Sequence, residues 1–110
     1  MQLKIKINMP SAEDVRPQKW TEIEILFDDG NYSVIFGEFE GNRCLGERWN
    51  GTENGYGYPH QADKPLWHVV PHYFNLPILH KILDLHLQNT SQTNREHIDS
   101  TIEAIEYFQN

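Results

Sequence analysis

The stretch from residue 20 to residue 39 restricts the fold of this chain more than any other. Two apolar-rich runs, WTEIEILF and NYSVIFGEF, flank the residues DDG. Asp29 and Gly30 suit the centre of a type I′ turn, which joins two antiparallel strands tightly. Pairing around this turn sets Phe27 opposite Tyr32, so the chain is expected to contain an antiparallel sheet with one buried face. Six apolar residues share that face: Ile23, Ile25, Phe27, Tyr32, Val34 and Phe36.

A second tight turn is expected at residues 41–42, between NYSVIFGEF and the following run RCLGERW. This turn sets Arg43 opposite Glu40 as an exposed ion pair across the two strands. It also sends Glu38 and Glu47 to the face that carries the apolar side chains. An unpaired carboxylate is costly there, so these two glutamates need an explanation.

A glycine precedes each of these glutamates, at Gly37 and Gly46. Glycine inside a strand often marks a bulge that redirects the next side chain. Two interpretations are open: bulges turn both glutamates to solvent, or a carboxylate pair lies in a polar pocket. We favour the bulges, because a buried glutamate is rare without a partner.

Four further segments show the periodicity of regular structure. Residues 2–8 (QLKIKIN) alternate between apolar and polar, which predicts a strand, and residues 65–70 (PLWHVV) predict another. One helix is expected over about residues 76–88, and a second begins at Thr93, which forms a capping box with Glu96. The second helix carries an apolar stripe at helical spacing: Ile98, Ile102, Ile105 and Phe108.

The length of 110 residues favours a single domain, and 38% hydrophobic residues suffice for a core. The predicted fold is α+β over residues 1–110: a mainly antiparallel sheet of about five strands, with two C-terminal helices packed on one face. The first helix is apolar over a wider arc than one sheet face covers, so we expect a homodimer. That arc consists of Leu76, Ile78, Leu79, Ile82, Leu83, Leu85 and Leu87.

Charge and composition exclude several classes of protein. Sixteen acidic residues outnumber nine scattered basic ones, so neither nucleic acid nor an anionic membrane is an expected partner. No apolar run approaches the roughly 20 residues of a membrane span, and Met1 leads into strand pattern without a signal peptide, which predicts a cytoplasmic location. Cys44, the single cysteine, allows no internal disulfide and no multi-cysteine zinc site, and we interpret it as a small hydrophobe.

The segment ERWNGTENGYGYPH, at residues 47–60, is the richest in side chains typical of recognition. It begins a stretch of some fifteen residues without periodicity, and loops this long are uncommon in compact domains unless they are functional or disordered. Its aromatic residues argue against disorder, and they suit either a binding loop or a loop that folds back to cap the sheet. The candidate binding residues are Arg48, Trp49, Asn50, Tyr56, Tyr58, His60, Trp67 and His68.

The six histidines do not predict a metal site or any other cofactor. His68 and His72 have helical ligand spacing, but Pro71 and the strand-like LWHVV run deny them a helix. His86, on the apolar arc of the first helix, is expected to be a hydrogen-bonded core residue. Acid–base chemistry is the one enzymatic route that the residues allow, with Glu47 or Glu38 beside His68 and with Arg48 holding an anionic substrate.

We favour a small, acidic binding or inhibitor protein of the immunity or regulatory kind, without catalysis. It would engage a protein partner through the loop at residues 48–68. One rival is an acid–base enzyme acting on a small polar or anionic molecule, and another is a ligand-binding domain with a pocket of aromatic side chains. A basic partner would suit the acidic face of the last helix, although solvation explains that face more simply. The acidic face consists of Glu96, Asp99, Glu103 and Glu106.

Overall fold

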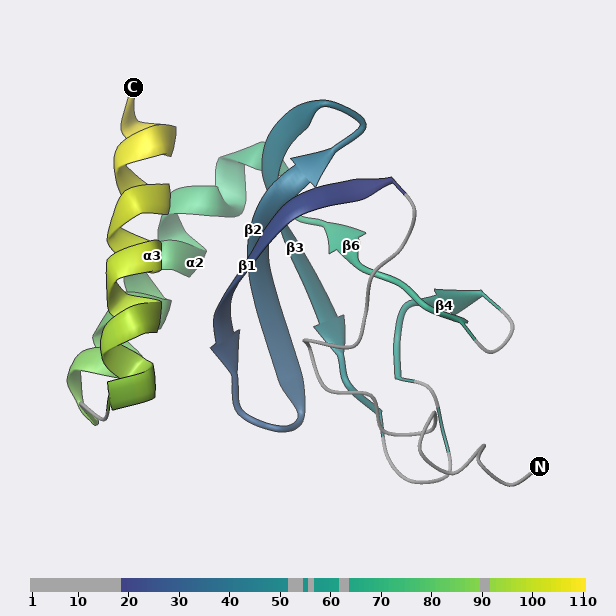
Figure 1. The fold of residues 1–110 in the computed structure, drawn as a ribbon, viewed down its shortest axis with the longest axis horizontal. Helices are drawn as coiled ribbons and strands as arrows, with labels where there is room; N and C mark the ends of the chain where they lie inside the picture. The colour runs from purple at the N-terminus through teal and green to yellow at the C-terminus, as the bar shows by residue number, and fades with distance from the viewer. Residues whose placement is uncertain (1–18, 52–54, 56, 62–63, 90–91) are drawn as a thin grey trace.

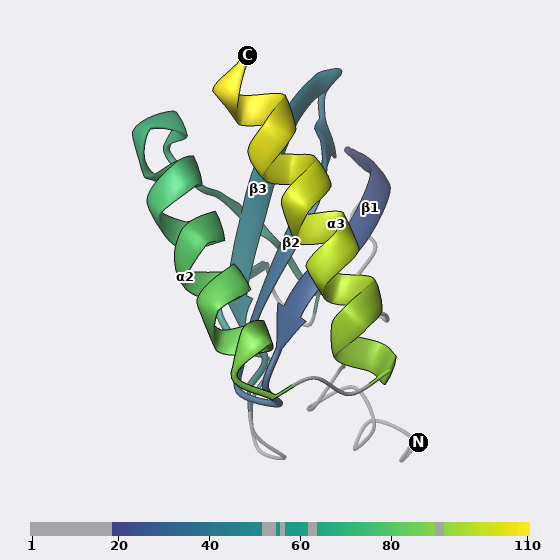
Figure 2. The ribbon, with the colours of Figure 1, turned by 90° about the vertical axis from the view of Figure 1, so that its left-hand side faces the viewer.

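The computed structural model describes residues 19–51, 55, 57–61, 64–89 and 92–110, and it shows two layers (Figure 1). One layer is an antiparallel sheet with the strand order β1-β2-β3-β6. The other consists of two helices, which lie side by side on one face of the sheet (Figure 2). The elements are β1 (Trp20–Asp28), β2 (Tyr32–Phe39), β3 (Asn42–Trp49), β4 (His60–Gln61), β5 (Lys64–Pro65), β6 (His68–Val69), the 3₁₀ helix η2 (His72–Phe74), α2 (Asn75–Leu87) and α3 (Gln92–Gln109).

This architecture confirms the predicted α+β class, the antiparallel sheet and the two C-terminal helices on one face. In the part of the chain that the structure describes, the main sheet has four strands, slightly fewer than the predicted five, and β4 pairs separately with β5. The predicted strand at residues 2–8 lies outside the described residues. Across the same described part, no helix is both long and apolar enough to cross a membrane.

The turn between β1 and β2 is wider than predicted. A type I′ turn needs positive φ at both central residues, but only Gly30 has it, at 93°. The Asp29 carboxylate accepts hydrogen bonds from the backbone N–H groups of Asn31 and Tyr32, both at 2.8 Å. The aspartate thereby stabilises a longer loop, and Phe27 faces Val34 instead of Tyr32.

Two register shifts in β1 divide its apolar residues between the two faces of the sheet. The shifts lie between Thr21 and Glu24 and between Ile25 and Phe27. Because side chains alternate along a strand, each extra residue moves those that follow to the other face. The prediction that all six apolar residues share one face is therefore wrong. Ile23 and Ile25 pack on the face opposite the helices, together with Trp20, Ile35, Phe39, Cys44 and Trp67.

The pairing of β2 with β3 is continuous, so the predicted bulges beside Glu38 and Glu47 are absent. The turn lies one residue earlier than predicted, at Glu40 and Gly41, which both have positive φ. Arg43 therefore faces Glu38, not Glu40. Both glutamates stay on the helix face, but they lie at opposite ends of it and form no carboxylate pair.

Gly46 has a packing role that explains its position. A Cβ atom there would lie 2.8 Å from the Cη2 atom of Trp20 and 3.0 Å from a side-chain carbon of Ile35. The indole of Trp20, which is 6% exposed, packs against the sheet at the place where Gly46 has no side chain. Glycine inside this strand therefore marks a close approach rather than a bulge.

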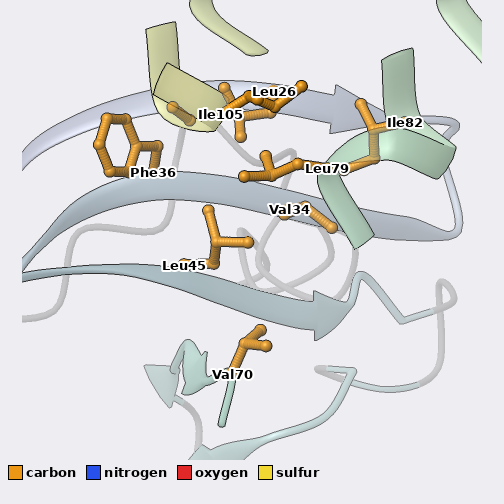
Figure 3. Close-up of a cluster of buried hydrophobic side chains, with 9 residues drawn as sticks. Leu26, Val34, Phe36, Leu45, Val70, Leu79, Ile82 and Ile105 are labelled. Atoms are coloured by element: carbon orange, nitrogen blue, oxygen red, sulfur yellow. The ribbon is translucent and has the colours of Figure 1, made fainter. Parts of the chain in front are cut away.

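The helix-facing core joins the sheet to both helices (Figure 3). Leu79 and Ile82 of α2 and Ile105 of α3 pack against strand residues such as Phe36 and Leu45. The predicted stripe on α3 is partly wrong, because Ile102 is 39% exposed. The helix buries Thr101 and Ala104 instead, and the Thr101 hydroxyl donates a hydrogen bond to the carbonyl oxygen of His97 at 2.6 Å. The four acidic residues of the predicted polar face are exposed: Glu96, Asp99, Glu103 and Glu106.

The predicted core role of His86 is confirmed. Its side chain is buried, and its Nε2 atom lies 2.6 Å from the carbonyl oxygen of Leu26. The remaining apolar arc of α2 is largely covered by the sheet and by α3, which leaves Leu85 and Leu87 as its exposed members. The homodimer stays a prediction, and the structure reduces the apolar area on which it was based.

Candidate functional site

Three aromatic side chains form a row across the end of the sheet, on the helix-facing side. Tyr32 of β2 pairs with Trp49 of β3, and Trp49 pairs with Tyr58 in an isolated bridge. Two backbone hydrogen bonds of 2.7 and 3.0 Å hold this bridge. Directly opposed side chains of antiparallel strands lie on the same face, and the rings of Tyr32 and Trp49 are 5.0 Å apart. The three residues therefore come from three separate segments, and the backbone pairing places them next to one another on the same face.

A polar row lies next to the aromatic one. Glu47 is two residues before Trp49 on β3, and it pairs with His68 of β6. The Tyr32 hydroxyl donates a hydrogen bond to Oε1 of Glu47, and Nδ1 of His68 lies 3.4 Å from Oε2. Both oxygens of this half-buried carboxylate therefore face partners from neighbouring strands.

The two rows line a pocket of about 550 Å³. Ligand pockets typically have volumes of about 300–1,000 Å³, so this one is large enough for a small molecule or a long side chain. The pocket lies beside the helix-covered core, because Glu47 is two residues from Leu45 and points to the same face. Its lining residues are Asp29, Tyr32, Glu47, Arg48, Trp49, Tyr58, Pro59 and His68.

Burial raises the pKa of the Tyr32 phenol well above its usual range, and the hydrogen bond and negative charge of Glu47 raise it further. A phenol is protonated at neutral pH in any case, and the raised pKa extends this state to higher pH. It donates to Glu47 and directs one carboxylate oxygen, while the other oxygen faces His68.

Arg48 contributes to the pocket wall, yet only 1% of its surface is exposed. It is on the opposite face of β3 from Glu47 and Trp49. Its Nη1 atom donates to the carbonyl oxygens of Pro59 at 3.2 Å and of Leu66 at 2.8 Å. Burial lowers the pKa of its guanidinium. Arg48 thus fastens the segment after β3 onto the strand through Nη1, while its buried Nε atom has no hydrogen-bond partner among the described residues.

Asn50 has a similar supporting position at the other side of the aromatic row. It is 4% exposed, and its side-chain amide bonds with the Ser33 hydroxyl at 2.8 Å and the Asp28 carboxylate at 3.1 Å. Its backbone N–H donates to the carbonyl oxygen of Asn31 at 2.7 Å. These bonds tie the chain after Trp49 to the β1–β2 hairpin.

The other predicted binding residues are dispersed. Trp49 and Tyr58 are 57% and 66% exposed at the pocket, and His68 joins them there. Trp67 is 5% exposed and packs on the opposite face, while His60 is exposed on β4 and does not line the pocket. Tyr56 lies outside the described residues.

The predicted binding residues did not include Asp29, Tyr32, Glu47 or Pro59, which the structure brings into the pocket. For Glu47 the sequence leaves three interpretations: a bulge that turns it to solvent, a carboxylate pair with Glu38 in a polar pocket, and acid–base chemistry beside His68. The signal for Tyr32 was present in the sequence, because a turn at Glu40 and Gly41 sets Tyr32 opposite Trp49. The predicted turn, one residue later, shifts that pairing by two residues.

Among the described residues, no three His, Cys, Asp or Glu side chains are placed to hold a metal ion together. Comparisons with models of known protein families, with curated proteins and with solved structures find no match to this chain. Function is therefore inferred from the pocket and from its exposed aromatic rim, which Trp49 and Tyr58 form.

Proposed function

We propose that this chain is a binding or inhibitor module that engages a protein partner through the pocket and its aromatic rim. The observation that carries the proposal is the exposure of Trp49 and Tyr58, at 57% and 66%, on a bridge held by two backbone hydrogen bonds. Large aromatic side chains are frequent hot spots of protein interfaces. Aromatic residues whose backbone is already held in place lose less conformational freedom when a partner binds.

The support under the rim strengthens this proposal. Arg48 and Asn50 are buried on either side of Trp49, and their hydrogen bonds fix the chain on both sides of the bridge. Hydrogen bonds from buried side chains restrict local motion, and here they come from the Nη1 atom of Arg48 and from the side-chain amide of Asn50. The exposed rings are thus presented by a fixed support, as a preorganised contact surface requires.

Replacing both rim residues, Trp49→Ala with Tyr58→Ala, is expected to abolish capture of the partner while the fold remains. Truncating a hot-spot aromatic typically costs about 2 kcal/mol or more, which is at least a roughly 30-fold loss of affinity. The measurement is affinity capture from the native cell extract, with the captured proteins quantified for wild type and variant. Wild type that captures no specific protein would count against the proposal.

The matched control is Tyr73→Ala. Tyr73 is 66% exposed, the same as Tyr58, but it belongs to η2 and does not line the pocket. The control should capture the partner as well as wild type does. Equal loss in the control and in the rim variant would show that exposed aromatic area in general, rather than this rim, holds the partner.

Acid–base catalysis is the second candidate, because Glu47 and His68 lie 3.4 Å apart in the same pocket. A positioned general acid or base typically contributes about 10²–10⁴-fold in rate. Under this candidate, wild type incubated with a metabolite extract should deplete one compound and accumulate another, as followed by mass spectrometry. Glu47→Gln should slow that conversion by about 100-fold or more, and identical metabolite profiles for the two proteins would rule the candidate out.

A further inference from the structure

We infer that the group this pocket takes from the partner is cationic, the guanidinium or ammonium of an Arg or Lys side chain. The inference rests on the proposed function and adds the chemistry of recognition to it. It arises from three features of the pocket: its aromatic walls, the sign of its charge and the orientation of Arg48.

The aromatic row supplies the first feature. Tyr32, Trp49 and Tyr58 lie side by side on one face, and all three line the pocket. The face of an aromatic ring carries partial negative charge and attracts a cation placed over it, and Trp does so most strongly. This fold already uses such a contact at another place, where the Arg43 guanidinium lies 3.9 Å from the ring centroid of Phe36.

Two carboxylates supply the second feature. Glu47 forms part of the pocket wall beside the aromatic row, and Asp29 lines the pocket from the β1–β2 turn. A carboxylate next to an aromatic wall suits a planar guanidinium, which can stack on a ring and donate hydrogen bonds to the oxygens together. The net charge of −7 for the whole chain adds a long-range attraction for basic partners.

The orientation of Arg48 favours a cationic ligand over an anionic one. Arg48 could have held an anion, but its Nη1 atom donates to the backbone carbonyls of Pro59 and Leu66 and its side chain is 1% exposed. An anion entering the pocket would meet Asp29 and Glu47 instead. A purely apolar group would remove water from the Glu47 carboxylate without replacing its hydrogen bonds, which is unfavourable.

Short peptides test the inference directly. The probes are acetyl-Gly-Arg-Gly-amide, the same peptide with citrulline, which is a neutral isostere of arginine, and the same peptide with glutamate. The measurement is the NMR signal of each tryptophan indole N–H during titration of the full chain to about 20 mM peptide, a range suited to weak binding. Trp49 is 57% exposed, whereas Trp20 and Trp67 are 6% and 5% exposed and serve as internal controls.

The arginine peptide is expected to shift the Trp49 signal in a saturable way, and to leave the signals of Trp20 and Trp67 unchanged. The citrulline peptide should bind at least about fivefold more weakly, because it lacks the charge for cation–π and carboxylate contacts. Equal binding of the two peptides, tighter binding of the glutamate peptide, or no saturable shift of Trp49 with arginine would each overturn the inference.

Charge-neutralising variants test whether the affinity for the arginine peptide depends on the carboxylate in the pocket. Glu47→Gln keeps an acceptor for the Tyr32 hydroxyl but removes the charge, so the affinity for the arginine peptide should fall about fivefold or more. Glu103→Gln removes the same charge from the exposed face of α3 and should leave the affinity unchanged. Equal losses in both variants would mean that the peptide responds to overall charge and not to this pocket, which also contradicts the inference.

The two proposals fail in different ways. If the rim variant loses the native partner while Glu47→Gln keeps it and the peptides show no preference for arginine, the cationic inference is wrong and the proposed function stands. If the rim variant keeps the native partner, the proposed function is wrong, whatever the peptides do.

Discussion

Replacing Arg48 by methionine is expected to lower the free energy of unfolding by about 2–4 kcal/mol, because hydrogen bonds from a charged group contribute about 1.5–3 kcal/mol each and are only partly additive. The variant keeps most of the side-chain volume but leaves the carbonyl oxygens of Pro59 and Leu66 without the Nη1 donor. The Pro59 carbonyl keeps the backbone N–H of Leu66 as a donor at 3.0 Å, so the main loss is at the Leu66 carbonyl, and an acceptor that loses its partner away from water is destabilising. The measurement is urea unfolding at equilibrium, followed by tryptophan fluorescence.

The matched control for this variant is Arg95→Met. Arg95 is exposed on α3, and exposed substitutions usually change stability by less than about 0.5 kcal/mol. The same two variants also test whether Arg48 supports the rim, because Arg48 bonds to the carbonyl oxygen of Pro59, the residue after Tyr58. If Arg48→Met were as stable as Arg95→Met, Arg48 would not be the structural fastener that its burial indicates, and its role as a ligand-binding residue would regain support.

Replacing Gly57 by alanine is expected to break the Trp49–Tyr58 bridge and to lower the free energy of unfolding by about 2–4 kcal/mol, from backbone strain and steric overlap together. Gly57 has φ of 76°, and a Cβ atom there would lie 2.1 Å from the carbonyl oxygen of Trp49. That oxygen accepts one of the two bridge hydrogen bonds. The backbone must therefore move at the point where the rim is held.

Hydrogen exchange of the Trp49 and Tyr58 amides measures this effect locally. Both amides donate the bridge bonds, so in the Gly57→Ala variant they should exchange at least about tenfold faster. Gly30→Ala is the control, because Gly30 also has positive φ, at 93°, but has no atom within 4 Å of the added Cβ. It should cost only the strain of about 1–2 kcal/mol and should leave the bridge intact. Unchanged bridge exchange in Gly57→Ala would contradict the packing described for this segment.

Several features of the fold were predictable because they depend on neighbouring residues. The helix expected over residues 76–88 is observed over 75–87, and the second helix begins within one residue of Thr93. Apolar spacing and capping residues act within one or two turns of a helix, so the sequence alone carries that information. The core role of His86 followed from the same periodicity, since it lies on the buried side of α2.

The strand pairings were less predictable, although the hairpins themselves were identified. The carboxylate of Asp29 lengthened the first turn, and positive φ at Glu40 moved the second turn by one residue. Each small displacement changed which side chains lie opposite each other. The prediction of the candidate site was affected most, because only the correct pairing of β2 with β3 places Tyr32 and Glu47 in it.

Arg48 shows why residue type alone is a weak guide to a site. Its position beside Trp49 and Asn50 suggested a ligand-binding residue, since Arg is frequent at interfaces. The alternation of β3 places Trp49 outward and Arg48 inward, under the segment that returns along the strand. Whether such a charge meets a ligand or the protein's own carbonyls depends on a segment that folds back from about ten to twenty residues later.

By itself, the sequence determined the α+β class, the two hairpins, both helices and the net charge of −7, since each follows from composition or from spacing within a short window. Only the tertiary structure decided which face each strand residue takes, which aromatic rings are exposed, and which polar side chains meet at Glu47. The physical reason is that each bulge and each turn length shifts the register of the strands that follow, and that segments returning later in the chain cover some side chains and leave others exposed. A shift of one residue, too small to change the local pattern, moves a side chain from the core to the solvent.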